Sequence, residues 1–393
     1  MSDHARVLGV GMVPFATPSR SEPYDVLARG AATAALTDAG LSYGDVQQAY
    51  VGYVYGDSTA GQHALYGLGT SGLPVVNVNN NCSTGSSALY LARQAIEGGA
   101  ADVVLVLGFE QMRRGALTAQ WPDRPSPLAR FDEALDLALG QDAESPIAPR
   151  YFGSAGAAYA DRYGLAADTF ARIAVKARRH AAGNPYAVFR SAVTVEEVLA
   201  SPVVYGPLTR LQCCPPTCGA AAAVLVSERW AQAHGAAGAV RIRAQAMTTD
   251  TPSSFEGDLT KLVGYDMSAS AARQVYEAAG IGPEDVPVVE LHDCFTTNEL
   301  LSYEALGLTP EGTAEKFIAD GDNTYGGRVV TNPSGGLLSK GHPLGATGLA
   351  QCAELVWQLR GQAGPRQVDG ARVALQHNIG LGGACVVTLY ERP

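Results

Sequence analysis

Hydrophobic positions follow two patterns along this chain, short continuous apolar runs and longer stretches with helical spacing. The runs Val103–Leu107, Val286–Leu291, Val373–Gln376 and Cys385–Leu389 predict inner strands that are buried on both faces. Residues 23–40 have the spacing of an amphipathic helix that ends at Gly40. Strands that alternate with helices in this way are typical of an α/β fold.

The pattern changes between about residues 113 and 202. This stretch is richer in Pro, Arg and Tyr, and its helices do not alternate with strands. We interpret it as a loop domain inserted into the first half of the chain. Within it, positive charge concentrates in the sequence KARRHAAGNPYAVFR, which contains Lys176, Arg178 and Arg179. The segment is either a solvated helix face or a surface that faces the phosphates of a ligand.

Composition and charge exclude several classes of protein. Of the 393 residues, 47% are hydrophobic and 17% charged, so disorder is not expected. The net charge of −10 disfavours nucleic-acid binding, which needs a basic footprint. No apolar stretch is long enough to span a membrane. The seven cysteines are scattered and odd in number, which disfavours a disulfide framework and favours a cytoplasmic location.

Cys82 is the first candidate for chemistry. It follows three asparagines and precedes the helical pattern TGSSALYLARQAI. The free N–H groups and partial positive charge of a helix N-terminus stabilise a thiolate and lower its pKa. The same N–H groups could hold the oxyanion formed when a thioester is attacked. A lone cysteine is more often a packing residue, but the polar and small neighbours favour a nucleophile.

His342 lies in the glycine-rich sequence SKGHPLGATG, just before a second helical pattern. A histidine there could remove the proton of a thiol, although packing is an equally ordinary role. The segments CSTGSS and HPLGAT share a reactive residue, a glycine three positions later (Gly85 and Gly345) and two small residues. This faint repeat predicts duplication of one α/β unit.

His292 and Cys294 directly follow the run that ends at Leu291, where the reactive groups of α/β enzymes usually lie. The two side chains could also bind zinc, but no paired cluster supplies further ligands, so we expect no metal site. The cysteines of the sequence CCPPTC, residues 213–218, precede a buried apolar run. We interpret them as structural.

Four dispersed motifs together carry a resemblance to a known family. They are NNNCSTGSSALYLARQAIEGG, HDCFTTNELLSYEALGL, NPSGGLLSKGHPLGATGLAQCAEL and QHNIGLGG, and NPYAVF also fits. With these motifs in order from end to end, the sequence resembles the thiolase superfamily. It is most similar to the sterol-carrier-protein-X type, without the appended lipid-transfer domain.

The resemblance implies a fold and an organisation. The expected fold has two fused βαβαβαββ halves in a five-layered α-β-α-β-α core. The first half would span residues 1–235, including the loop domain, and the second residues 236–393. The resemblance further implies a homodimer or homotetramer and coenzyme A as a substrate, with no tightly bound cofactor. The basic segment in the loop domain would then contact coenzyme A.

The resemblance also implies roles for the site residues. Cys82 would be the acylated nucleophile, His342 its activator and Cys294 the acid/base. One oxyanion hole would use His292 and His342, and the other the N–H groups of Cys82 and Gly380. Many thiolases have their acid/base cysteine two residues before that glycine, where this chain has Asn378. The acid/base function is therefore expected at Cys294, because a thiol exchanges protons readily near neutrality.

The implied reaction is cleavage of a 3-oxoacyl-CoA by coenzyme A, or the reverse Claisen condensation. Two alternatives on the same fold are a C-acyltransferase that does not use coenzyme A and a retro-aldolase that works with a small OB-fold partner. Cys82, His342 and Cys294 together count against the aldolase, which needs no acyl-enzyme. An alternative of another class is a non-catalytic binder of acyl-CoA or lipid, which would tolerate loss of Cys82.

Overall fold

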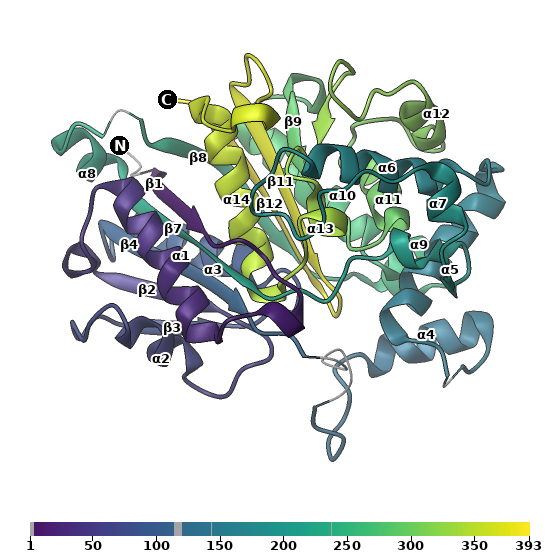
Figure 1. Ribbon diagram of the computed structural model, residues 1–393, viewed down its shortest axis with the longest axis horizontal. Helices are drawn as coiled ribbons and strands as arrows, with labels where there is room; N and C mark the ends of the chain where they lie inside the picture. The colour runs from purple at the N-terminus through teal and green to yellow at the C-terminus, as the bar shows by residue number, and fades with distance from the viewer. Residues whose placement is uncertain (1–3, 114–119, 143, 237) are drawn as a thin grey trace.

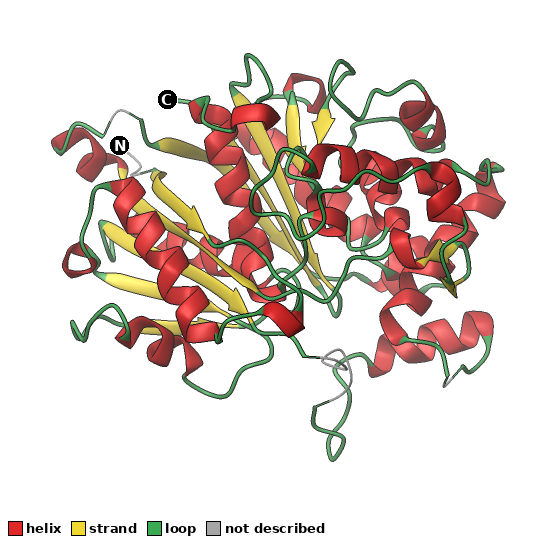
Figure 2. Ribbon diagram, in the orientation of Figure 1, coloured by secondary structure: helices red, strands yellow, loops and turns green. Residues whose placement is uncertain are grey.

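The computed structural model describes residues 4–113, 120–142, 144–236 and 238–393. Within these residues, ten strands form one mixed sheet in the order β10-β9-β11-β12-β8-β1-β7-β4-β2-β3 (Figure 2). The first half contributes β1 (Ala5–Met12), β2 (Gln48–Gly52), β3 (Val75–Val78), β4 (Val103–Glu110) and β7 (Gly219–Ser227). The second contributes β8 (Val240–Thr248), β9 (Val288–Glu290), β10 (Val330–Thr331), β11 (Val373–Gly380) and β12 (Ala384–Glu391).

The same strand order occurs twice. Numbered within each half, the five strands are arranged third, second, fourth, fifth, first. In both halves the fifth strand is antiparallel to its two neighbours. The halves join where β1 pairs with β8 through only two residue pairs, Arg6 with Arg241 and Val7 with Val240. The expected duplication is therefore present, although the two sheets are continuous at one edge rather than separate.

Helices lie between and outside the two halves of the sheet. The principal ones are α1 (Tyr24–Ala39), α3 (Thr84–Glu97), α10 (Tyr265–Ala279), α11 (Thr296–Ala305) and α14 (Leu344–Arg360). Shorter helices are α2 (Ala60–Tyr66), α8 (Glu228–Ala233), α9 (Leu259–Leu262), α12 (Ala314–Ala319) and α13 (Gly336–Ser339). In Figure 1, α14 runs between the two sets of strands and α1 covers the outer face of the first set.

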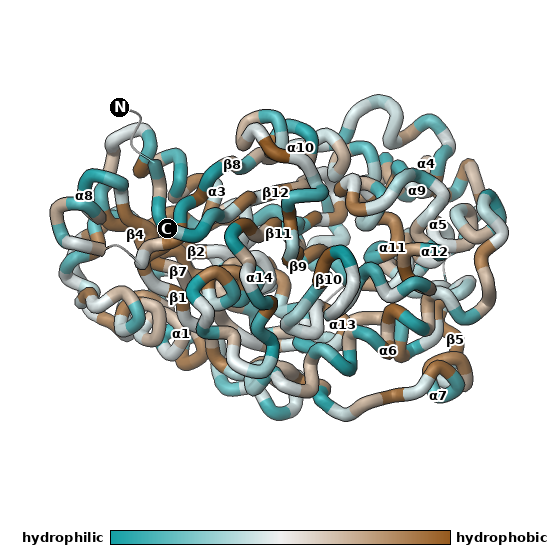
Figure 3. The backbone as a smooth tube through the Cα atoms, turned by 90° about the horizontal axis from the view of Figure 1, so that it is seen from above, coloured by the Kyte–Doolittle hydropathy of each residue, from teal (hydrophilic) through white to brown (hydrophobic). Residues whose placement is uncertain are grey.

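The alternating side chains of β4 define the layers. Val103, Leu105 and Leu107 pack in the apolar cluster with α1, whereas Val104 and Val106 pack in the cluster that contains α3 and α14. The second half repeats this arrangement, since Leu375 faces the cluster of α10 and α11. The order helix, sheet, helix, sheet, helix gives the five layers that were expected. Hydrophobic residues accordingly follow the inner strands in Figure 3, and hydrophilic ones gather on loops and outer helices such as α8.

The inserted segment is mainly helical. It contains α4 (Ala129–Leu139), α5 (Ile147–Tyr163), α6 (Thr169–Ala181) and α7 (Val195–Leu199), followed by the hairpin of β5 (Val203–Tyr205) and β6 (Leu208–Thr209). These elements gather on the right-hand side of Figure 1, beside α9 and α11 of the second half. Residues 114–119 and 143 of the expected loop domain lie outside the described residues. No helix in the described part of the chain combines the length and apolarity needed to cross a bilayer.

Candidate active site

Cys82 lies on the tight turn between β3 and α3. Asn81 just before it has a φ of 51°, in the left-handed region that asparagine tolerates better than most residues. Two hydroxyls close the turn, since Ser83 donates to the Asn80 carbonyl at 2.9 Å and Thr84 to the Asn81 carbonyl at 2.6 Å. The asparagine-rich sequence thus fixes the direction of the cysteine at the beginning of α3.

The end of β11 lies directly against this turn. A Cβ added to Gly380 would be 2.2 Å from the Asn80 carbonyl oxygen, so only glycine fits there. Asn81 also donates from its amide to the Leu381 carbonyl at 3.0 Å. Gly380 is thus brought beside Cys82, and its role as an oxyanion donor stays a prediction. The neighbouring N–H of Leu381, which lowers the pKa of Cys82, was not foreseen.

His342 lies between α13 and α14, and its protonation follows from its neighbours. The Thr347 hydroxyl donates to the Pro343 carbonyl at 2.9 Å, so its oxygen must accept from Nδ1 of His342 at 2.7 Å. Burial lowers the pKa of His342 to about 3, with a further contribution from Lys340. The neutral ring with a proton on Nδ1 has a lone pair on Nε2. That nitrogen is buried and has no hydrogen-bond partner in the structure.

His292 and Cys294 lie on the loop between β9 and α11. The Asn298 amide donates to the His292 carbonyl. The Asp293 carboxylate accepts from the backbone N–H groups of Leu337 at 2.7 Å and Leu338 at 3.3 Å. These bonds connect the loop of His292 to the segment that leads into His342. The loop that carries His292 and the segment that precedes His342 are therefore held together.

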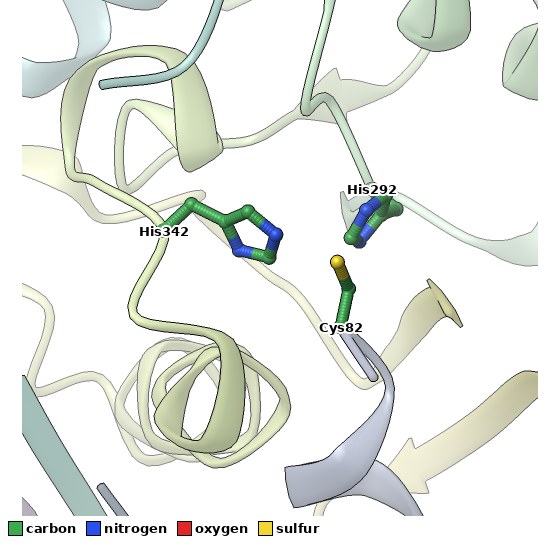
Figure 4. Close-up of side chains that lie close together, drawn as sticks. All are labelled: Cys82, His292 and His342. Carbon is green, nitrogen blue, oxygen red and sulfur yellow. The ribbon is translucent and has the colours of Figure 1, made fainter. Parts of the chain in front are cut away.

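The three side chains converge from three different loops (Figure 4). The sulfur of Cys82 and one nitrogen from each of His292 and His342 lie within 4.8 Å of one another. The two rings are nearly perpendicular, at 83°, with centroids 5.2 Å apart. Figure 4 shows the sulfur pointing between them. A cysteine and two histidines are also a possible set of metal ligands, which their distant positions in the sequence do not reveal.

The electrostatics of Cys82 differ from the sequence expectation. Burial raises the pKa of its thiol to about 12, and the Glu110 carboxylate adds to this effect. Backbone N–H groups act in the opposite direction but do not prevail. The expected lowering by a helix N-terminus is therefore wrong for the resting site. The cysteine is a thiol until a base takes its proton.

Glu110, at the end of β4, is a residue that the sequence interpretation missed. Burial raises its pKa to about 7, although it accepts from the N–H groups of Tyr55 at 3.0 Å, Gly345 at 3.0 Å and Val54 at 3.1 Å. It thus connects β4 to the first turn of α14. An acidic residue at the carboxyl end of an otherwise apolar strand was the available signal.

Cys214 is another addition to the site. Its N–H donates to the Cys294 carbonyl at 2.9 Å, next to an antiparallel bridge between Cys213 and Phe295. Burial raises the pKa of Cys294 well above the usual value, and the neighbouring thiols Cys214 and Cys82 contribute. Cys214, which was interpreted as structural, therefore lies beside the expected acid/base.

The basic segment of α6 is only partly at the surface. Lys176 is buried, forms an ion pair with Glu299 and donates to the Thr331 hydroxyl at 2.6 Å. Arg178 lies over the ring of Phe189, 4.4 Å from its centroid. Arg179 is exposed and donates to Thr324 at 2.9 Å. The expectation that Lys176 faces a phosphate is therefore wrong, because its ammonium group is used inside the protein.

The doubled sheet and a cysteine between two histidines define an enzyme of the thiolase fold. Comparison with known proteins agrees with this class. "Thiolase, N-terminal domain" matches residues 7–229 and "Thiolase C-terminal domain-like" matches residues 246–390. The chain therefore belongs to the thiolase family, as the resemblance implied.

Similar proteins extend over nearly the whole chain. Sterol carrier protein 2 of Homo sapiens is 55% identical over 390 residues, which cover 98% of this chain and 71% of that protein. Benzoylsuccinyl-CoA thiolase subunit BbsB of Thauera aromatica is 40% identical over 385 residues, with 96% and 94% covered. The solved structure of an Ltp2-ChsH2(DUF35) aldolase has a TM-score of 0.82 at 25% identity, with 99% and 98% covered. These findings confirm the predicted fold and support thiolase-type acyl transfer that depends on coenzyme A.

Proposed function

We propose that this chain is a 3-ketoacyl-CoA thiolase, an acetyl-CoA C-acyltransferase that works through an acyl-Cys82 intermediate. The observation that carries the proposal is the Nε2 atom of His342, which is buried without a hydrogen-bond partner in a ring that has one nitrogen within 4.8 Å of the Cys82 sulfur. The free lone pair makes His342 the group placed to accept the Cys82 proton while the sulfur attacks the substrate.

The first half-reaction cleaves the substrate. Nε2 of His342 takes the Cys82 proton as the sulfur attacks the keto carbon of a 3-oxoacyl-CoA. The bond between Cα and Cβ breaks, which leaves an acyl group on Cys82 and the enolate of a shorter CoA thioester. The Cys294 thiol gives its proton to that enolate carbon and becomes a thiolate. The high pKa of Cys294 keeps it protonated until this step.

The second half-reaction restores the enzyme. The Cys294 thiolate takes the proton of a free coenzyme A thiol, whose sulfur then attacks the acyl-Cys82 carbonyl. The Cys82 sulfur leaves and recovers its proton from the His342 imidazolium. The same steps in reverse perform a Claisen condensation. His292 with His342 would hold one substrate oxygen, and the N–H groups of Cys82 and Gly380 the other.

The remaining expectations form part of the same proposal. Coenzyme A is a substrate, and no tightly bound cofactor is required by these steps. The exposed Arg179 is the member of the basic segment that stays available for a phosphate. A homodimer is supported by β3, a strand at the edge of the sheet that exposes Val76. Location in the cytoplasm stays a prediction.

A second candidate is a retro-aldolase with a small OB-fold partner protein. It is favoured by the similarity to the Ltp2-ChsH2(DUF35) aldolase structure. The arrangement of Cys82, His342 and Cys294 disfavours it, because a retro-aldolase needs no acyl-enzyme. The two functions therefore differ in whether Cys82 becomes acylated.

Intact-mass measurement tests the proposal. The purified protein is incubated with a series of 3-oxoacyl-CoA thioesters, with and without free coenzyme A, beside Cys82→Ala. We expect an acyl adduct on the wild type alone, which coenzyme A discharges as a shortened acyl-CoA. An adduct that coenzyme A cannot discharge would indicate an acyltransferase of another type. A folded protein without any adduct would contradict the mechanism and direct attention to the aldolase.

A further inference from the structure

Asn378 occupies the position where many thiolases have a cysteine, and its side chain is fully buried. Its amide nitrogen lies 3.2 Å from the Cys82 carbonyl oxygen and 3.0 Å from Nδ1 of His292. A backbone carbonyl can only accept a hydrogen bond. The nitrogen of the amide must therefore face the Cys82 carbonyl, which settles the orientation of the Asn378 side chain without reference to any histidine.

This orientation determines the protonation of His292. The amide nitrogen can only donate, so Nδ1 of His292 must accept and cannot carry a proton. Burial, together with His342 and His377, holds the pKa of His292 well below the usual value, so the ring is neutral. A neutral ring without a proton on Nδ1 carries it on Nε2. His342 has the opposite arrangement, with its proton on Nδ1.

A chain of buried hydrogen bonds keeps Asn378 in place. The Ser86 hydroxyl on α3 donates to the Asn378 amide oxygen at 2.8 Å. Ser86 in turn accepts from the Gln376 amide at 2.8 Å, and the same amide donates to the Gly348 carbonyl at 2.7 Å. The Tyr390 hydroxyl donates to the Gln376 amide oxygen at 2.5 Å. These bonds hold the Asn378 amide oxygen toward Ser86 and leave the amide nitrogen toward Cys82 and His292.

We propose that Asn378 is a positioning residue that holds His292 as the Nε2–H tautomer, so that His292 donates to a substrate oxygen while His342 accepts the Cys82 proton. Two neutral histidines beside one thiol could otherwise exchange these roles. Asn378, which stands in place of a cysteine, thus determines which histidine donates a hydrogen bond and which accepts the proton. This inference rests on the proposed function for its catalytic consequence, but the tautomer itself is a property of the resting enzyme.

The direct test is nuclear magnetic resonance of the wild-type enzyme labelled with ¹⁵N-histidine, without substrate. His292→Gln and His342→Gln variants assign the two rings. We expect the Nε2 resonance of His292 and the Nδ1 resonance of His342 to be those of protonated nitrogens. A protonated Nδ1 on His292 would overturn the proposal, whatever the enzyme's activity. A correct tautomer in an enzyme without thiolase activity would instead count against the proposed function alone.

A variant of Asn378 tests whether the tautomer of His292 affects catalysis. In Asn378→Asp the carboxylate can only accept, so we expect Nδ1 of His292 to become protonated and kcat to fall by about 10²–10³-fold, the usual effect of losing one oxyanion donor. The His342 resonances report in the same spectrum whether the rest of the site is intact. Tyr390→Phe is the matched control, because Gln376 stays oriented by Gly348, and we expect the His292 tautomer and kcat to be retained. An unchanged His292 spectrum in Asn378→Asp would contradict the proposal.

If Asn378→Asp does not fold, Asn378→Leu removes the donor without adding a charge. We then expect His292 to show a mixture of both tautomers. A single Nε2–H tautomer in that variant would show that Asn378 does not hold the ring, and would also overturn the proposal.

Discussion

Gly85 and Gly345 lie against each other at the first turns of α3 and α14. A Cβ added to Gly85 would be 2.8 Å from the Gly345 carbonyl oxygen and 3.2 Å from the Leu349 nitrogen. Both glycines stand three residues after a reactive side chain, Cys82 in one half and His342 in the other. The sequence repeat therefore corresponds to a close contact between the two halves. This contact brings the nucleophile and its base together.

Gly85→Ala should destabilise the protein despite the better helix propensity of alanine. The added methyl group meets backbone atoms of α14 that cannot move freely, and such overpacking costs about 1–3 kcal/mol. Urea unfolding measures the change. Gly30→Ala in α1 is the control, because its Cβ would meet only the Val13 side chain, at 3.0 Å. A Gly85→Ala protein as stable as the wild type would contradict the close contact.

Several inner strands, the first long helix and four residues of the candidate site could be predicted from the sequence. A continuous apolar run located β4, because a strand that is buried on both faces has few polar positions. The shorter run Val373–Gln376 located only the first part of β11, whose later residues include His377 and Asn378. Cys82, His292, Cys294 and His342 were found from their places after strands or before helices. These signals come from residues that are neighbours in the chain, so a single sequence is enough to detect them.

Properties that depend on packing between distant segments were not predictable in this way. The pKa of Cys82 depends on burial and on Glu110, which reaches the site only through the fold. Cys214 reaches Cys294 across 80 positions of the sequence. Lys176 differs, since it shares the buried face of α6 with Ile173 and His180. The helical spacing of Lys176 would have predicted a buried position, but its charge led us to predict a surface position.

Thr347→Val should slow acylation of Cys82. Without the hydroxyl, Nδ1 of His342 loses the acceptor that fixes its proton. The proton can then move to Nε2, which removes the lone pair that accepts the Cys82 proton. We expect the acylation rate to fall roughly tenfold or more, but less than for His342→Ala, where loss of a general base costs about 10²–10⁴-fold. Rapid-quench mass spectrometry measures acyl-Cys82. Thr347→Ser keeps the hydroxyl and should restore most of the rate; failure to do so would point to packing by the methyl group.

Alkylation of Cys82 should depend steeply on pH. The thiolate is the reactive form, and a raised pKa means that it becomes populated only as pH rises toward about 12. The rate with iodoacetamide should therefore increase about tenfold per pH unit from neutrality without levelling near 8.5, the pKa of an ordinary thiol. Peptide mass spectrometry separates Cys82 from the other cysteines, and glutathione is the reference thiol. A plateau for Cys82 below pH 9 would show that its pKa is not raised.

Removal of metal ions should leave activity unchanged, although Cys82, His292 and His342 resemble a ligand set. Nδ1 of each histidine is engaged, and Nε2 of His292 holds a proton when Asn378 donates to that ring. Only two of the three groups then offer a free lone pair toward a common point. Dialysis against dipicolinate, with metal content measured before and after, tests this. Activity that disappears and returns with zinc would instead identify the cluster as a zinc site.

Lys176→Met should reduce stability rather than affinity for coenzyme A. Its ammonium group is paired with Glu299 in a buried network that includes Tyr303 and Thr331. Removing one partner of a buried ion pair leaves the other charge unpaired, which costs about 3–5 kcal/mol. Urea unfolding should show this loss, and the double variant Lys176→Met/Glu299→Gln should recover part of it.

Arg179, the exposed arginine of α6, tests whether the basic segment binds coenzyme A apart from its effect on stability. Arg179→Ala should leave stability nearly unchanged, because its side chain lies at the surface. If the segment contacts a phosphate of coenzyme A, this variant raises the KM for coenzyme A, whereas Lys176→Met does not while it remains folded. The reverse result, a raised KM with unchanged stability for Lys176→Met, would mean that the buried lysine leaves its ion pair when the substrate binds.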